Sequence, residues 1–103
     1  MPADTPLVAN ERLGETVRQI IADVLMVPIE RVRPTSVLVM DLGAESIDFL
    51  DFVFRLEQAL GRKIPPSRWG DFVKERLDGE DPASGITADV VREFAEREAA
   101  AGA

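Results

Sequence analysis

The 103-residue sequence contains no cysteine, no histidine and no tyrosine. The lack of cysteine excludes disulfide bonds, thiolate zinc sites and a cysteine nucleophile. The lack of histidine removes the most common general base and metal ligand in proteins. We therefore expect a protein that is not an enzyme, binds no metal and gains its chemistry from something added to it.

Long apolar stretches are also missing. No run reaches the roughly 18 apolar residues that a membrane-spanning helix needs. The first ten residues, MPADTPLVAN, lack the basic and apolar regions of a signal peptide. These features predict a cytoplasmic protein with no membrane span.

Acidic side chains outnumber basic ones by 19 to 12, which gives a net charge of −7. This sign disfavours nucleic acid and anionic membranes as partners and favours proteins with basic docking patches. The acidity is strongest in residues 41–60, where Arg55 is the only basic side chain. Residues 61–80 carry a basic cluster instead, formed by Arg62, Lys63, Arg68, Lys74 and Arg76.

The spacing of apolar residues predicts two long helices. Steps of three and four between Leu13 and Leu25 place an apolar stripe on a first helix, which Pro28 ends. A second helix is predicted over 46–60, with Gly61 as its stop. Its apolar residues exceed one stripe, so at least one phenylalanine should stay partly exposed. The stripe expected to be buried contains Ile47, Leu50, Val53, Leu56 or Phe54, and Leu60.

The remaining segments complete an all-α prediction. Residues 28–45 hold too many helix breakers for a helix, and the one strand-like run, 36–40, has no partner, so we expect a packed loop and no sheet. A short helix follows two adjacent prolines, and a last helix begins after Thr87. The predicted fold is one domain, a bundle of three main helices with a short helix in an extended link between the second and the last. Residues 1–9 and 98–103 are expected to be frayed.

Ser46 stands where a glycine-containing turn meets the acidic second helix. The usual role of a serine at this position is to cap the helix. A phosphate on its side chain would instead face unpaired backbone N–H groups and the positive end of the helix dipole. Gly43 can adopt backbone angles that leave the serine open to a modifying enzyme. Because the rest of the sequence offers so little chemistry, we favour modification of Ser46.

The residues Asp-Leu-Gly-Ala-Glu-Ser-Ile-Asp at 41–48 resemble the Asp-Leu-Gly-x-Asp-Ser-Leu pattern of the acyl carrier proteins. Glu45 and Ile47 depart from that pattern but keep its charge and its apolar character. The resemblance implies that Ser46 carries a covalent 4′-phosphopantetheine arm, derived from coenzyme A, whose thiol holds an acyl group as a thioester. It also implies a monomer whose partners are a phosphopantetheinyl transferase, an acyl-loading enzyme, and a ketosynthase or acyltransferase of fatty-acid or lipid A synthesis.

A second set of residues is predicted to dock these partners. Charges beside Ser46 would raise association rates and fix orientation, and an exposed aromatic residue would add apolar contact. A solvated helix face is the alternative interpretation of the charges. The predicted docking residues are Glu45, Asp48, Asp51, Phe54 and Glu57.

The link over 64–86 is longer than in ordinary acyl carrier proteins. Its start, 64–69, and the run 47–54 resemble specialised carriers that deliver very long hydroxylated acyl chains to lipid A. We hypothesise that the apolar residues of the link extend the acyl-binding interior or form a surface for a dedicated acyltransferase. Simple covering of the bundle is the alternative. The residues concerned are Trp69, Phe72 and Leu77.

Two other functions remain open. A discrete peptidyl carrier would use Ser46 and the same arm to hold an amino acid. A helical protein-interaction module would not be modified at all. Uptake of the arm separates both carriers from the module, and the loading enzyme separates the two carriers from each other.

Overall fold

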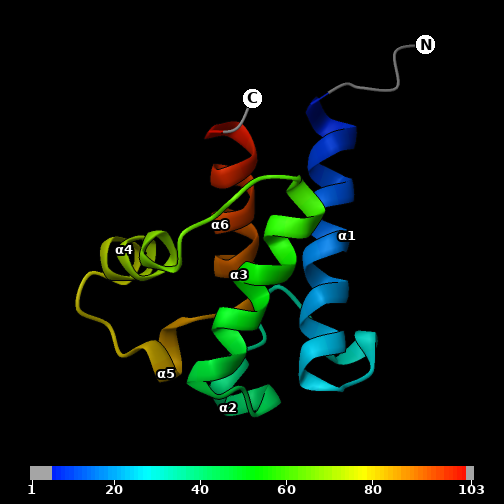
Figure 1. Ribbon diagram of the computed structural model, residues 1–103. Coiled ribbons are helices and arrows are strands. Elements are labelled where there is room, and N and C mark those ends of the chain that lie inside the picture. Colours follow the sequence, from blue (N-terminus) through cyan, green and yellow to red (C-terminus); the bar gives the residue numbers. More distant parts are fainter. Residues whose placement is uncertain (1–5, 102–103) are drawn as a thin grey trace.

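The computed structural model describes residues 6–101, which form helices joined by turns and loops (Figure 1). In chain order the elements are α1 (Pro6–Leu25), the 3₁₀ helix η1 (Ile29–Arg31), α2 (Leu38–Leu42), α3 (Ser46–Leu60), α4 (Pro66–Leu77), α5 (Pro82–Gly85) and α6 (Ala88–Ala101).

The three long helices α1, α3 and α6 pack together, with α1 against both of the others. The helix α4 lies in the link between α3 and α6 and stands beside them, on the side away from α1 (Figure 1). This arrangement confirms the predicted all-α bundle with a shorter helix in the link. In the described part of the chain, every helix is too short or too polar to cross a membrane.

The connection between α1 and α3 contains more structure than predicted. It includes both η1 and α2, and Val37 forms an isolated antiparallel bridge with Thr87. The side chain of Asp41 caps the start of α2, because its Oδ2 accepts a hydrogen bond from the Val37 N–H at 2.8 Å. A helix of this length is too short to show an apolar period, so the sequence did not reveal it. As predicted, residues 6–101 form no sheet.

Both ends of the described chain are helical where fraying was expected. The helix α1 begins at Pro6, and α6 runs to Ala101. At the C-terminal end the physical reason is Glu98, which is only 2% exposed and accepts a hydrogen bond from Arg68 at 2.8 Å. The remaining terminal residues lie outside the described range.

The face of α3 that is buried differs from the predicted one. The predicted stripe is wrong at Ile47 and Leu50, which are 69% and 52% exposed, while the 55% exposure of Phe54 confirms that one phenylalanine faces solvent. Burial of the other two phenylalanines removes more apolar surface from water than burial of the predicted residues would. The residues of α3 in the core are Phe49, Phe52, Val53 and Leu56.

An aromatic cluster joins α3, α4 and α6. Trp69 of α4 stacks on Phe49 of α3 with ring centroids 5.8 Å apart, and it meets Phe94 of α6 edge-on at 5.2 Å. Phe72 of α4 contacts the same Phe94 ring at 5.3 Å. Aromatic pairs at these distances add to the stabilisation that comes from buried area. The helix α4 is therefore part of the core.

Polar contacts also connect α4 to α6. Arg76 donates hydrogen bonds from Nε and Nη2 to the two carboxylate oxygens of Glu93, at 2.9 and 3.0 Å. This hydrogen bonding lowers the pKa of Glu93 below its ordinary value. Close by, the guanidinium of Arg97 lies 5.0 Å from the centroid of the Phe72 ring.

Replacement of Trp69 by alanine should lower the free energy of unfolding by about 3–5 kcal/mol, because it leaves a cavity among three aromatic rings. Phe54→Ala provides the matched control, since its ring is largely in solvent and its loss should change stability by no more than about 0.5 kcal/mol. Urea unfolding followed by circular dichroism measures both. Equal stability of the two variants would contradict a structural role for Trp69.

The Arg76–Glu93 pair should make stability depend on pH. A carboxyl group whose pKa is lower in the folded state stabilises the protein above its unfolded pKa, and this stabilisation is lost as pH falls through the folded pKa. Wild type should therefore exceed Glu93→Gln in stability at pH ~7, and the difference should be smaller at pH ~3. Urea unfolding at both pH values tests this, with Glu30→Gln as an exposed control on η1. A gap that stays constant with pH would argue against the ion pair.

Candidate attachment site at Ser46

A tight turn leads the chain from α2 into α3. Gly43 ends α2 with φ 76° and ψ 24°, in the left-handed region that side chains with a Cβ disfavour. The Gly43 N–H donates to the Val39 carbonyl at 3.1 Å, and the Ala44 N–H donates to the Leu38 carbonyl at 2.9 Å. These bonds satisfy carbonyl groups at the end of α2 and turn the chain directly toward α3.

Glu45, rather than Ser46, occupies the N-cap position of α3. The Glu45 N–H donates to Oδ2 of Asp48 at 2.8 Å, which closes the start of the helix. Ser46 is the first residue inside α3, and its side chain is exposed. No hydrogen bond among residues 6–101 involves its hydroxyl. The interpretation of Ser46 as an ordinary helix cap is therefore wrong, and the hydroxyl stays available for chemistry.

The surroundings of Ser46 fit a phosphate group joined to it. The first N–H groups of a helix have no partner within the helix, and the helix dipole favours negative charge at this end. The turn is open on its outer side, because no atom beyond Gly43 and its two chain neighbours lies within 4 Å of the point where a Cβ on Gly43 would stand. The carboxylates of Glu45 and Asp48 offset part of the electrostatic attraction, so a covalent bond suits this site better than free phosphate binding.

Arg31 supports the turn from a distance along the chain. Its Nη2 donates a hydrogen bond to the carbonyl oxygen of Asp41 at 3.0 Å. That carbonyl belongs to the last turn of α2, where no N–H of the helix can reach it. No local pattern indicates this role, because Arg31 lies in a segment that was predicted to be a loop.

Two of the predicted docking residues have roles inside the protein. Asp48 uses its carboxylate on the Glu45 N–H, as described above. Oε2 of Glu57 accepts a hydrogen bond from the Ile64 N–H at 2.6 Å, which fastens the start of the link to α3. Each carboxylate thus has a partner within the protein through one of its two oxygens.

The other predicted docking residues are open to solvent or nearly so. Glu45 and Phe54 are exposed, and Asp51 is half-buried with an ion pair to Arg55 at 3.5 Å. Phe54 shares its side of the helix with two apolar residues that the sequence had assigned to the core. Ile47, Leu50 and Phe54 are three and four residues apart and lie on one side of the helix. We call this surface the exposed α3 face.

The predicted residues of the link, Trp69, Phe72 and Leu77, are all buried. Their positions agree with the alternative interpretation, in which α4 covers the bundle. As they stand, these three side chains present no surface to an acyltransferase. A role in an acyl-binding interior would require α4 to move.

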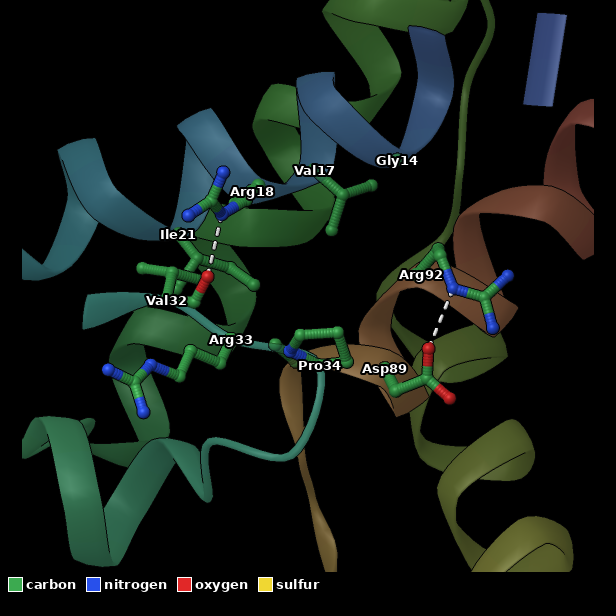
Figure 2. A pocket seen from close by; sticks show the side chains of 10 residues that line it. Gly14, Val17, Arg18, Ile21, Val32, Arg33, Pro34, Asp89 and Arg92 are labelled. Carbon is green, nitrogen blue, oxygen red and sulfur yellow. Dashed lines mark hydrogen bonds and ion pairs between the residues drawn. The ribbon is translucent and has the colours of Figure 1, made fainter. Parts of the chain in front are cut away.

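A small pocket lies between α1, residues 32–34 and the start of α6 (Figure 2). Its volume is about 80 Å³, and no residue that lines it belongs to α2 or α3. Two arginines at its rim already have partners: Nε of Arg18 donates to the Val32 carbonyl at 2.6 Å, and Nε of Arg92 donates to Oδ1 of Asp89 at 2.8 Å. The pocket is therefore separate from the candidate site at Ser46.

Comparison with known proteins identifies similarity to several acyl carrier proteins. Proteins named acyl carrier protein AcpXL from Mesorhizobium japonicum, Rhizobium meliloti and Brucella melitensis are 38%, 39% and 39% identical to this chain over 61 residues. The aligned stretch covers 59% of this chain and 66%, 64% and 66% of those relatives, so the chain spans slightly less than two thirds of their length.

A protein family described as the phosphopantetheine attachment site matches residues 15–68, just over half of the 103-residue chain. The matched range includes α2, the turn at Gly43 and Ser46. The family implies a covalently attached 4′-phosphopantetheine. A protein with such an attachment site carries this group and is not a catalyst. The chain belongs to the phosphopantetheine attachment site family.

Proposed function

We propose that this chain is an acyl carrier protein in which Ser46 holds the 4′-phosphopantetheine arm. The observation that carries the proposal is the exposed Ser46 hydroxyl at the first residue of α3, which is left free because Glu45 and Asp48 close the helix start. The family match over 15–68 and the acyl carrier relatives support it. When bound, the arm supplies a thiol that holds an acyl group as a thioester.

The protein's own residues present the attachment point and protect it from side reactions. Gly43 and the hydrogen bond from Arg31 to Asp41 fix the turn that exposes the serine. The chain has no cysteine, so the thiol of the arm meets no internal thiol with which it could exchange. Chemical steps on the cargo are left to partner enzymes: a phosphopantetheinyl transferase, an acyl-loading enzyme, and an acyltransferase or ketosynthase.

The proposed cargo is a long acyl chain. The resemblance of 47–54 and 64–69 to specialised carriers favours a very long hydroxylated chain for lipid A, and the relatives share the name of acyl carriers. An acyl chain of ordinary length would not require the aromatic residues in the link that contains α4. A peptidyl carrier would use Ser46 in the same way, and loading assays with acyl and aminoacyl donors separate the two.

The proposed docking surface is the exposed α3 face, with Glu45 and Asp51 beside it. Apolar contact at the centre of such a surface supplies most of the affinity, while charges at its rim mainly set the association rate and orientation. Phe54 is the largest side chain on this face and the best candidate for an anchor. Asp48 and Glu57 each use one carboxylate oxygen within the fold, and we assign them the smaller part in docking.

Incubation with coenzyme A and a phosphopantetheinyl transferase should add one arm to the wild type and none to Ser46→Ala, as measured by intact-mass spectrometry. Ser67→Ala is the matched control, because Ser67 is also an exposed serine in the first turn of a helix, and it should load like the wild type. Absence of any mass gain with several transferases would refute the carrier proposal. Loading of Ser46→Ala would place the arm elsewhere.

Variants of α3 should separate docking from folding. Phe54→Ala should raise the KM of the transferase about tenfold, or ~1.4 kcal/mol, and leave stability unchanged. Glu57→Gln should do the opposite: it weakens the bond to the Ile64 N–H and should lower stability by about 1 kcal/mol with KM nearly unchanged.

Gln58→Ala controls for truncation of an exposed polar side chain one turn along α3 from Phe54, on the same side of the helix. Transferase kinetics and urea unfolding of the three variants provide the comparison. A larger effect of Glu57→Gln than of Phe54→Ala on KM would restore Glu57 to the docking surface and remove Phe54 as its anchor.

A further inference from the structure

The pocket between α1, residues 32–34 and the start of α6 has an apolar interior (Figure 2). Val17, Ile21 and Val32 form its walls, and each of them is no more than 2% exposed. Water is a poor occupant, because a buried water needs roughly two to four polar partners and these side chains offer none. The interior therefore suits an apolar group.

The size of the pocket limits that group to a small one. Its volume is about 80 Å³, whereas a cavity of ~150 Å³ holds a benzene ring. By this comparison the pocket has room for roughly three or four carbon atoms, which excludes a long acyl chain. A branched group, such as isopropyl or isobutyl, places that many carbons within a short reach of the rim.

Gly14 keeps one wall of the pocket open. It lies within α1, where glycine destabilises a helix relative to alanine. Close packing does not require glycine here, because a Cβ at this position would stand 3.8 Å from Cδ of Arg92, an ordinary contact distance. The contact between α1 and α6 thus leaves this glycine unexplained. A binding pocket explains it, since a side chain at this position would take up part of the space.

Three arginines from three different elements stand at the rim of the pocket: Arg18, Arg33 and Arg92. Asp89 is the only acidic residue among those that line it, although the whole chain has a net charge of −7. In Figure 2, Arg18 and Arg92 lie on opposite sides of the pocket, with Pro34 between them. The mouth of an apolar pocket is therefore locally basic, which favours a ligand with a negative charge.

The three arginines are not equally occupied by partners within the protein. Arg92 pairs with two carboxylates of its own helix, and Arg18 lies 3.8 Å from an exposed carboxylate of Glu15. The exposed side chain of Arg33 makes no hydrogen bond or ion pair within residues 6–101. In Figure 2 it extends away from Arg92, on the side of Arg18. A carboxylate on that side of the rim gains a charge-assisted partner in Arg33.

We propose that this pocket binds a short branched aliphatic group that carries a carboxylate a few bonds away. The branched end fills the apolar interior, and the carboxylate stays at the rim beside Arg33 and Arg18. Two sources offer this chemistry: a free branched-chain acid and the C-terminal leucine of a peptide. Because no residue that lines the pocket belongs to α2 or α3, binding leaves Ser46 and the exposed α3 face free. The inference does not rest on the carrier function.

The free acid is tested with 4-methylpentanoate, titrated into the unmodified chain and followed by ¹H–¹⁵N NMR. The amides of Gly14, Val32 and Ala88 should shift in a saturable way, whereas those of Ser46 and Leu50 should not. Each buried carbon is worth roughly a fourfold gain in affinity, so we expect a Kd of ~1–10 mM. Acetate lacks the branched tail and should bind at least about tenfold more weakly. Uncharged 4-methylpentanol should bind about threefold more weakly.

The peptide source is tested with acetyl-glycyl-glycyl-leucine, which presents the same group at a chain end. Tighter binding of this peptide than of 4-methylpentanoate assigns the pocket to a peptide C-terminus, and the reverse order assigns it to a free acid. Either result supports the site. If neither probe gives saturable shifts at the pocket amides up to roughly 50 mM, well above the expected Kd, the proposal is overturned.

Two variants locate the binding within the pocket. Gly14→Ala adds a Cβ without a clash and should weaken 4-methylpentanoate binding about threefold, and Gly14→Leu should abolish it. Gly70→Leu is the matched control, because Gly70 lies within α4, away from the pocket, and has open space at its Cβ position. Far-UV circular dichroism establishes that each variant keeps its helices. Unchanged affinity in both Gly14 variants would overturn the site.

The role of the rim is tested by Arg33→Gln, which should weaken the binding of 4-methylpentanoate about threefold and leave that of 4-methylpentanol unchanged. Lys63→Gln removes an exposed positive charge outside the pocket and serves as the control. An equal effect of Arg33→Gln and Lys63→Gln on the affinity for the acid would overturn the assignment of the carboxylate to the rim beside Arg33.

Discussion

The helix α3 can bury only one of its two apolar faces, and the rest of the structure depends on which one. At about 100° per residue, Phe49, Phe52 and Leu56 lie on one side of the helix, and the exposed α3 face lies opposite. The aromatic rings of α4 and α6 meet the first side, through the stack of Trp69 on Phe49 and the edge contact with Phe94. Burial of Phe49 and Phe52 thus turns the side that carries Ile47, Leu50 and Phe54 outward, next to Ser46. The same packing that holds α4 in place leaves exposed the surface that we propose for docking.

Ser46 is available because its neighbours satisfy the start of the helix. A serine before a helix ordinarily uses its hydroxyl on a backbone N–H. Here the Asp48 carboxylate accepts a hydrogen bond from the Glu45 N–H, and the left-handed conformation of Gly43 turns the chain toward α3. The function assigned to the serine therefore depends on three residues that carry no chemistry themselves. The arm supplies the reactive thiol, and the protein supplies a position for it.

The long helices and the candidate site at Ser46 could be predicted because both have local signals. The helices show an apolar period, and the candidate site has a short pattern around one serine. The rotation of α3 could not be predicted, since two stripes with helical spacing compete and only the partners in space decide between them. The helix α2 was missed because five residues are too few to show a period. The structural roles of Glu57 and Glu98 were hidden because their partners, Ile64 and Arg68, come from other parts of the fold.

The hydrogen bond from the Ile64 N–H to Glu57 joins the last turns of α3 to the first residues of the link. The exposed α3 face and α4 therefore do not respond to force independently. A partner that shifted the end of α3 would act through this bond on the segment that carries Arg62 and leads to α4. A protein that docks on the exposed α3 face would therefore also act on the link to α4, because the Glu57 carboxylate joins the two segments.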